Sequence, residues 1–414
     1  MTRLLVITQS FPFGNRIDFL EDEIGALADA FDTITLAPTS PAGECNDLPD
    51  NVDVDMTLCP RLTRGRRLRS LLSFPAVRLA AREMRLHART MARPRQLARA
   101  LLSVGGAAAV TRWYRETAVG SGRPSVVYSY WLTESVLGIR RADPSVPIVS
   151  RVHGGDLFLE RHPGNYIPQH ESLLRACSAV ASVSDRGHSY LVERYPMHRD
   201  RLHVRRLGTR PFPASSPSAD STVRVVTCSS LTAVKRPVLA AEAIVRLAED
   251  RNVVWDHFGD GPLRPEVERV VGEAHAGARS PGRGSLRFTL HGAVPNTDVA
   301  EHFESHAVDV LLNTSSSEGV AVSMMEALSA GVPVVATAVG GTPEIITDGN
   351  GRLVPPDPDA ARIAEAIAVV ADDPGPAVAR IEFWRRHYAA SSNYEQFAQW
   401  LTTFLSDEAP CPPR

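Results

Sequence analysis

Hydrophobic residues in the first half of the chain fall into short runs separated by helical patterns. The runs are RLLVIT (3–8), TITLAP (33–38), SVVYSYW (125–131), VPIVSRVHG (146–154) and AVASVS (179–184). Between the first two, DFLEDEIGALADAF (18–31) has the spacing of an amphipathic helix. Strands that alternate with helices predict a parallel sheet with helices on both faces.

The same alternation restarts after a segment rich in proline and serine, residues 208–222, which is typical of an interdomain linker. The second set of runs is VRVVTCSS (223–230), VVWDHFG (253–259), LRFTLHG (286–292), VDVLLNT (308–314), VPVVAT (332–337) and GRLVP (351–355). The pattern predicts an α/β protein with two doubly wound, Rossmann-like domains that face a central cleft.

The predicted domain boundaries follow from these patterns. Residues 1–207 form the N-terminal domain, 208–222 the linker and 223–380 the C-terminal domain. Residues 381–414 are expected to be helices that return to the N-terminal domain. The length of 414 residues, with 43% hydrophobic and 22% charged residues, allows two separate cores.

The five cysteines and the length of the apolar runs indicate in which cellular compartment the protein is expected. No two cysteines have the C-x-x-C spacing of a zinc knuckle or a redox motif, and scattered thiols fit a reducing environment. The N-terminal apolar run is too short for a signal peptide, and LLSVGGAAAV (101–110) is too short to span a bilayer. We therefore expect a cytoplasmic protein.

Charge is divided unevenly along the chain. Residues 1–212 hold 29 arginines against 21 acidic residues, whereas the remainder holds 16 cations against 26 acidic residues. The basic excess is concentrated in residues 61–100, which contain 12 arginines and one acid, Glu83. Leucine and alanine interleave there at helical spacing. The segment fits a helix pair on an anionic membrane or acceptor, and it equally fits a solvated, arginine-biased helix face.

Candidate chemistry gathers after the run that ends near Asn313. Small polar residues lead to Glu318 and Gly319, and a helix is expected to start near Val322. The free N–H groups of a helix start suit a phosphate. Glu318 and Glu326 are eight residues apart, roughly 12 Å if helical, which suits an extended ligand with hydroxyls at both ends, such as a nucleotide sugar. Simple complementation of the helix dipole is the alternative.

These residues carry a resemblance to a known family. Glu318, seven residues, Glu326 and then ALSAGVPVVATAVGGTPEII resemble the signature of the retaining GT-B glycosyltransferases of family 4, the glycosyl transferases group 1. LTAVKRP, HFGDGPL and FTLHGAVPNTDV resemble its diphosphate-binding lysine segment and its next two strand ends. FPFGNRIDFLEDEI, RVHGGDLFLERH and RLHVRRLGT resemble a bacterial branch that builds surface polysaccharides and related glycosides.

The resemblance implies a donor site made of named residues. Lys235 is expected to contact the donor diphosphate, Glu326 the ribose hydroxyls and Glu318 the hydroxyls of the transferred sugar. Backbone N–H groups at the helix start are expected to take the distal phosphate, and glycines to let the chain approach the ligand closely. The remaining expected donor-binding positions are Gly14, Gly261, Ala293, Gly319, Ala321, Val322 and Ser323. His153, which follows a strand end, is expected to line the cleft beside the reacting sugar, so the catalytic candidates are Glu318, His153 and Lys235.

Lys235 is the only lysine in the chain. An ammonium is a compact point charge, which a planar guanidinium does not replace equivalently. The sequence departs from the family pattern nearby, because Ser230 stands where an arginine is common and Arg236 where a glycine is more usual. Either Arg236 supplies the missing charge to the diphosphate, or phosphate binding is weaker.

The resemblance implies a hexosyltransferase that moves a sugar from a nucleotide-diphosphate donor, with UDP favoured, to a saccharide, a lipid-linked saccharide or a small natural product. No cofactor, metal or nucleic acid is expected. The D-x-D strings at 53–55 and 357–359 are interpreted as structural. A nucleotide-sugar epimerase and a non-catalytic partner subunit are the alternatives. The sequence leaves the donor, the acceptor and the oligomeric state open.

Overall fold

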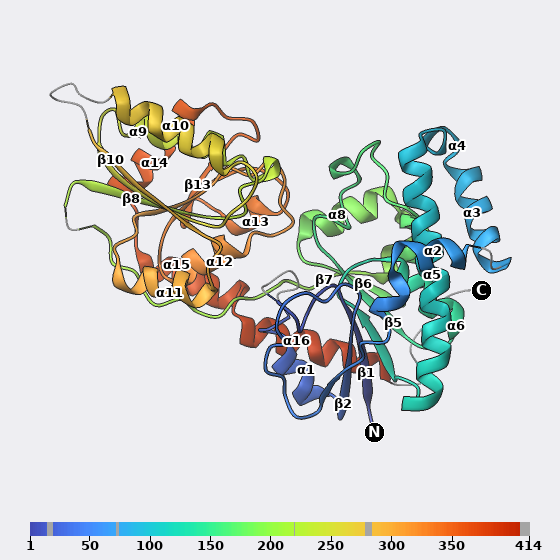
Figure 1. Cartoon of the computed structure of the whole chain (residues 1–414). Helices are drawn as coiled ribbons and strands as arrows, with labels where there is room; N and C mark the ends of the chain where they lie inside the picture. The colour runs from blue at the N-terminus through green and yellow to red at the C-terminus, as the bar shows by residue number, and fades with distance from the viewer. Residues whose placement is uncertain (15–19, 72–73, 219, 278–283, 406–414) are drawn as a thin grey trace. The chain divides into compact units, whose positions relative to one another are not determined.

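A computed structural model describes residues 1–14, 20–71, 74–218, 220–277 and 284–405. The chain forms two compact units (Figure 1). Unit 1 is Met1–Arg206 together with the C-terminal segment that begins at Ser391, and unit 2 is Leu207–Ala390.

Unit 1 is built on a seven-stranded parallel sheet with the order β3-β2-β1-β4-β5-β6-β7. The strands are β1 (Arg3–Thr8), β2 (Thr33–Pro38), β3 (Val52–Val54), β4 (Val126–Ser129), β5 (Ile148–Val152), β6 (Ala179–Ser182) and β7 (Leu202–Val204). The order reverses at β1, which lies between β2 and β4. The predicted strands are confirmed, and β3 and β7 extend the two edges of the sheet.

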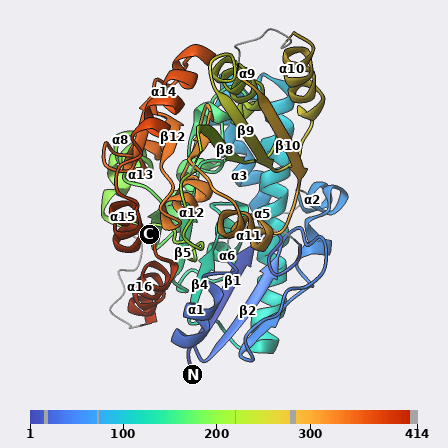
Figure 2. The same cartoon turned by 90° about the vertical axis from the view of Figure 1, so that its left-hand side faces the viewer.

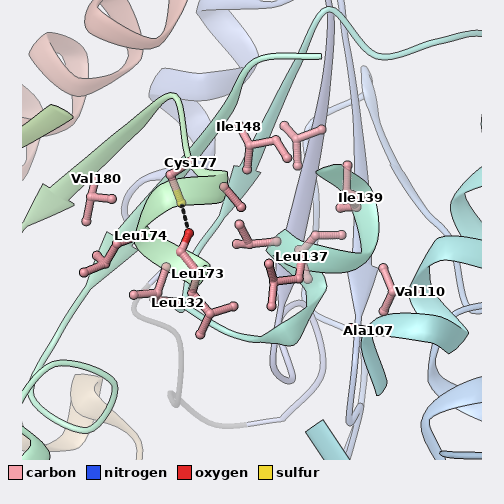
Figure 3. Packing of buried hydrophobic residues seen from close by; sticks show 14 of the residues in the cluster. Ala107, Val110, Leu132, Leu137, Ile139, Ile148, Leu173, Leu174, Cys177 and Val180 are labelled. Atoms are coloured by element: carbon pink, nitrogen blue, oxygen red, sulfur yellow. Dashed lines mark hydrogen bonds between the residues drawn. The ribbon is translucent and has the colours of Figure 1, made fainter. Parts of the chain in front are cut away.

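Helices cover both faces of this sheet. They are α1 (Ile24–Ala30), α2 (Arg64–Ser70), α3 (Phe74–Leu86), α4 (Ala88–Met91), α5 (Pro94–Ser121), α6 (Glu134–Ala142), α7 (His170–Ala176), α8 (Asp185–Arg194) and α16 (Ala390–Thr402). Alternate residues of β1 enter different cores, as the period of two in a strand requires. Leu5 packs in the cluster with Trp113 of α5, whereas Leu4 packs in the cluster with Phe397 of α16. Figure 3 shows the first of these clusters around Cys177 and Leu173.

Unit 2 contains a six-stranded parallel sheet with the order β10-β9-β8-β11-β12-β13. Its strands are β8 (Thr222–Cys228), β9 (Asn252–Phe258), β10 (Leu286–Gly292), β11 (Val310–Asn313), β12 (Val334–Thr337) and β13 (Gly351–Val354). Figure 2 shows β8, β9 and β10 side by side. Every strand matches a run predicted from the sequence, and the order reverses at β8, between β9 and β11.

Seven helices described in unit 2 lie on the two faces of its sheet (Figure 1). They are α9 (Pro237–Leu247), α10 (Arg264–Gly277), α11 (Asn296–Ser305), α12 (Val322–Ser329), α13 (Thr342–Ile345), α14 (Ala360–Asp372) and α15 (Ala377–His387). Ile244 of α9 and Ile367 of α14 pack with Val225 and Val310 of the sheet. The α/β class with two doubly wound sheets is therefore confirmed.

The segments between the domains differ in detail from the expectation. Residues 208–222, expected to be a linker, lie along unit 2, where the Phe212 N–H donates to Ser329 Oγ (2.8 Å) and the Ser218 N–H to Asp309 Oδ1 (2.8 Å). Helix α15 also belongs to unit 2. Of the C-terminal helices that were expected to return to the N-terminal domain, only the part from Ser391 belongs to unit 1. Among the described residues, no helix is long and apolar enough to cross a bilayer.

Candidate donor site in the second unit

The predicted site residues of unit 2 lie at the carboxyl ends of β8 and β11. These neighbouring strands flank the point where the order of the sheet reverses, which is where open α/β sheets usually bind ligands. The loop after β8 contains a short 3₁₀ turn, Ala233–Lys235, and the loop after β11 leads into α12. The topology therefore brings Lys235 and Glu318 together although 83 residues separate them.

Lys235 and Glu318 form an ion pair. Lys235 Nζ lies 2.6 Å from Glu318 Oε1, with the lysine side chain 25% exposed and the glutamate 7% exposed. The same oxygen accepts hydrogen bonds from Ser315 Oγ (2.6 Å) and Asn313 Nδ2 (3.3 Å). Ser315 and Asn313 were not predicted as site residues. Because their bonds converge on Oε1, they fix the Glu318 carboxylate at the end of β11.

The backbone around Lys235 is fixed by the loop that follows β11. Thr314 Oγ1 lies 3.0 Å from the carbonyl oxygens of Lys235 and of Arg236 and donates to them. The Ser316 N–H donates to the Val234 carbonyl at 2.8 Å. The loops after β8 and β11 are thus held together by hydrogen bonds on either side of Lys235.

The Arg236 side chain bonds to the surrounding loops. Its Nε donates to the Thr314 carbonyl (2.6 Å), and Nη2 donates to the carbonyls of Ser315 (2.9 Å) and Pro356 (2.8 Å). Nη1 lies 3.3 Å from Asp357 Oδ1. The guanidinium therefore joins the loops after β8, β11 and β13. Arg236 also has φ 49°, a left-handed conformation that favours glycine.

The start of α12 presents backbone N–H groups that have no partner within the helix itself. The N-cap residue Ala321 is extended and makes no side-chain capping bond, and Val322 begins the helix as predicted. Gly319 is buried just before it. Gly340, which was not predicted, has φ 52°, and a Cβ there would lie 1.8 Å from the Glu318 carbonyl oxygen. The turn at Gly340 therefore packs directly against the segment that carries Glu318.

Glu326 lies in the middle of α12 with only 7% of its surface exposed. Its Oε1 accepts a hydrogen bond of 2.6 Å from Nδ2 of Asn296, the first residue of α11. Asn296 was not predicted, although PNTD lies in a segment that carries the family resemblance. The bond holds the Glu326 side chain toward the start of α11.

The loops after β9 and β10 support this arrangement. A Cβ at Gly261 would come within 2.6 Å of the Leu231 carbonyl oxygen, and the Leu231 N–H donates to the Asp260 carbonyl (3.0 Å). Close packing against the loop before Lys235 thus requires Gly261, whether or not it contacts a ligand. Ala293, just after β10, is exposed.

His257, which was not predicted, lies beneath Lys235. A pocket at the carboxyl ends of β8, β9 and β11 is lined by both residues and by Asn313 and Ser315. Nδ1 of His257 lies 2.7 Å from Thr227 Oγ1, and burial lowers the pKa of this imidazole to about 4. At neutral pH the ring is neutral, so Lys235 remains the cation on this wall of the pocket.

Gly14 and His153 belong to unit 1. Gly14 has φ 73°, and its N–H donates to the Glu44 carbonyl at 2.9 Å, which ties the loop after β1 to residues 42–44. His153 follows β5, and its ring lies against the ring of Trp131, with 4.2 Å between centroids. Burial lowers the pKa of His153 well below its usual value. Neither ring nitrogen has a hydrogen-bond partner among the described residues.

One carboxylate of each D-x-D string has a structural partner. Asp55 Oδ2 accepts from Trp113 Nε1 (3.1 Å), and Asp55 Oδ1 accepts from the Thr57 N–H (2.7 Å). Asp359 caps the N-terminus of α14 through the Arg362 N–H, at 2.8 Å. Asp55 and Asp359 are thus engaged in hydrogen bonds within unit 1 and unit 2, respectively.

The fold and this arrangement of strand ends define a GT-B protein, with two Rossmann-like domains in one chain. Sucrose-phosphate synthase from Thermosynechococcus elongatus superposes with a TM-score of 0.68 at 17% identity, covering 97% of this chain and 99% of that one. The Anabaena protein HepE in complex with UDP and glucose gives 0.63 at 15% identity, covering 97% and 100%. The predicted GT-B fold is confirmed.

The family assignment comes from unit 2. Residues 222–373, which make up most of unit 2, match the family model of the glycosyl transferases group 1. The chain is also similar to 2-deoxystreptamine glucosyltransferase of Streptomyces kanamyceticus, with 32% identity over 151 residues. That match covers 36% of this chain and 36% of the relative, so the chain spans about a third of the length of that protein.

Proposed function

We propose that the protein is a retaining glycosyltransferase. It moves a sugar from a nucleotide-diphosphate donor, with UDP-sugars favoured, to a hydroxyl of a saccharide, a lipid-linked saccharide or a small natural product. The observation that carries the proposal is the Lys235–Glu318 pair, 2.6 Å apart. Glu318 lies in the loop that leads to the uncapped start of α12. A cation for phosphates, a carboxylate for sugar hydroxyls and free N–H donors occur within one set of strand-end loops.

Lys235 supplies the positive charge for the leaving group. When a donor binds, its diphosphate competes with Glu318 for the ammonium, and the N–H groups of Val322 and Ser323 at the helix start take the distal phosphate. Charge that grows on the departing diphosphate then meets preorganised donors rather than water. With these groups in place, the proposed reaction is independent of a metal ion.

The two glutamates divide the ends of the donor between them. Glu326, held by Asn296, accepts hydrogen bonds from the ribose hydroxyls. Glu318 accepts from hydroxyls of the transferred sugar and stabilises positive charge that develops at its anomeric carbon. The bond from that carbon to the phosphate oxygen breaks on the face where the acceptor oxygen attacks. The acceptor proton passes to the leaving phosphate, so the reaction retains configuration without a separate general base.

The comparisons support the donor class. The relative from Streptomyces is named as a glucosyltransferase, and the Anabaena structure contains UDP and glucose. An epimerase on the same architecture would also need a nucleotide site but would turn over without an acceptor. A non-catalytic subunit would have no need of the paired Lys235 and Glu318.

A nucleotide-release assay separates these functions. Binding of UDP, GDP, ADP and TDP, measured by calorimetry, first identifies the donor base. Release of the nucleotide from the matching nucleotide sugars is then compared with and without a panel of sugar acceptors. Acceptor-dependent release supports the transferase. Epimerisation without acceptor, or binding of none of the four nucleotides, would contradict it.

We also propose that α2 and α3 contact anionic lipid, because apolar side chains stand exposed among their arginines. Leu68, Val77, Met84 and Leu86 are 43–55% exposed, and these helices lie beside α5 (Figure 1). Each cation near such a surface contributes about 1 kcal/mol. Binding to phosphatidylserine liposomes should therefore fall as salt rises. Absence of binding at low salt would favour a solvated helix face and a water-soluble acceptor.

A further inference from the structure

Three metal-binding side chains converge at the β9–β10 edge of the unit 2 sheet. They are Asp256 of β9, His291 of β10 and His302 of α11, and their nearest ligand atoms all lie within 4.8 Å of one another. None of the three belongs to the candidate donor site. Asp256 and His302 are partly buried, and His291 is exposed.

Asp256 faces one imidazole with each of its oxygens. His291 Nε2 lies 2.7 Å from Oδ1, and His302 Nε2 lies 3.8 Å from Oδ2. Zinc bonds of about 2.0–2.2 Å in a tetrahedral site place ligand atoms roughly 3.3–3.5 Å apart. The ligand atoms of the three side chains lie within 4.8 Å of one another, so side-chain shifts of up to about 1 Å would bring them to these separations around one ion.

The backbone and the neighbouring rings orient both imidazoles. The ladder between β10 and β9 shifts register between Leu290 and Gly292, so His291 is the extra residue of a bulge, a feature that re-aims a side chain. Phe258 stacks on the His291 ring, with centroids 4.4 Å apart and planes 6° apart. His306 stacks on His302 at 4.4 Å and 13°. The two Nε2 atoms are therefore directed at the carboxylate by packing.

A simple hydrogen bond explains only part of this cluster. The 2.7 Å contact with Asp256 gives the His291 imidazole a hydrogen-bond partner. It does not explain why the His302 imidazole lies beside the same carboxylate. The side chain of His302 is only 10% exposed, and burial lowers its pKa. Its Nε2 therefore faces the carboxylate from a largely buried position.

We propose that Asp256, His291 and His302 bind one zinc ion, with water as the fourth ligand. Two imidazole nitrogens and one carboxylate oxygen form a donor set that zinc commonly takes. The ion would fasten α11 to β9 and β10. Asn296 begins the same helix, six residues or roughly 9 Å from His302, and contacts Glu326. The metal would thus fix the position of Asn296. This positioning role rests on the proposed function, whereas the proposal that the three side chains bind a metal ion is independent of it.

Metal titration of the whole chain tests the site. Protein stripped with a chelator is titrated with Zn²⁺ by calorimetry and with Co²⁺ by visible absorption, which reports tetrahedral coordination. The wild type should bind one equivalent of either ion. His291→Gln should weaken binding about 100-fold or more, since loss of even an outer-shell partner costs 10–100-fold. His302→Gln and Asp256→Asn should do the same.

His188→Gln is the matched control, because His188 lies on α8 of unit 1. It should bind as the wild type does, and zinc should raise Tm in both proteins but not in His291→Gln. Because His291 is exposed, that variant should fold even if His302→Gln does not. A wild-type dissociation constant weaker than about 0.1 mM, or unchanged binding by folded His291→Gln, would overturn the proposal. UDP binding is measured on the same samples, so that a failure of the zinc proposal can be told apart from a failure of the donor-site proposal.

Discussion

The ammonium of Lys235 lies 2.6 Å from Oε1 of Glu318. The only lysine of the chain is thus paired with the carboxylate at the neighbouring strand end. The pairing keeps a cation and an anion together in a partly buried pocket, where either would be costly alone. A diphosphate that binds to Lys235 would free Glu318 Oε1 for a sugar hydroxyl, so the two predicted roles are coupled.

Glu326→Ala should weaken donor binding more than it slows chemistry. Ribose hydroxyls do not react, and a lost hydrogen bond to a charged group costs about 1.5–3 kcal/mol. Calorimetric dissociation constants and kcat at saturating donor, measured on the same samples, check this. Asn296→Ala, which removes only the partner of Glu326, should have a smaller effect on affinity. An unchanged dissociation constant in Glu326→Ala would remove Glu326 from the site.

Glu318→Gln should lower turnover more than donor affinity. The amide keeps hydrogen bonding to the sugar but no longer stabilises positive charge at the reacting carbon. It also leaves Lys235 without its anionic partner, which favours binding of the diphosphate. Steady-state kinetics should therefore show a fall in kcat with a KM that is unchanged or lower. Full turnover would restrict Glu318 to hydrogen bonding.

Arg236→Ala should lower stability rather than donor affinity. Its guanidinium donates to the carbonyls of Thr314, Ser315 and Pro356, and each hydrogen bond from a charged group contributes about 1.5–3 kcal/mol. We expect a lower Tm, with UDP affinity of the folded protein close to that of the wild type. A loss of UDP affinity at an unchanged Tm would instead indicate that Arg236 contacts the diphosphate.

Excess EDTA should leave kcat at saturating donor unchanged at room temperature, because Lys235 and the helix start carry the leaving-group charge. Tm should nevertheless fall if the zinc site at Asp256 is occupied in the purified protein. Rates and melting curves recorded with and without chelator distinguish the two effects. A large loss of turnover that Mg²⁺ or Mn²⁺ restores would overturn the metal-free mechanism.

The central strands β4, β11 and β12 could be predicted because each is a short, largely apolar run buried along its whole length, as a parallel sheet covered on both faces requires. The short edge strands β3 and β7 carry polar residues and were not among the predicted strands. The start of α12 at Val322 was predicted from the change of pattern after Asn313, and the structure places it there. The course of residues 208–222 was not predictable in the same way. Proline and serine indicate a loop, but the hydrogen bonds that lay it along unit 2 depend on Asp309 and Ser329, far away in the sequence.

The site was less predictable than the fold, because its partners come from different strand ends. Lys235 stood out as the only lysine, and the glutamates by their spacing. Arg236 was assigned to the phosphate on charge alone, and its carbonyl partners become visible only when three loops are brought together. The pairing of Asn296 with Glu326 and the cluster around Asp256 depend likewise on strand order, which no local pattern specifies.

The Lys235 series tests the central claim most directly, namely that unit 2 binds a donor diphosphate through this ammonium. Turnover and UDP affinity are measured for the wild type, Lys235→Arg and Lys235→Ala, with circular dichroism as the control for folding. Activity should fall in that order, because the guanidinium of Lys235→Arg keeps the positive charge but not the compact shape of the ammonium. Removal of such a preorganised donor costs roughly 3–4 kcal/mol, or a hundredfold to a thousandfold in rate. Wild-type turnover and affinity in Lys235→Ala would contradict it.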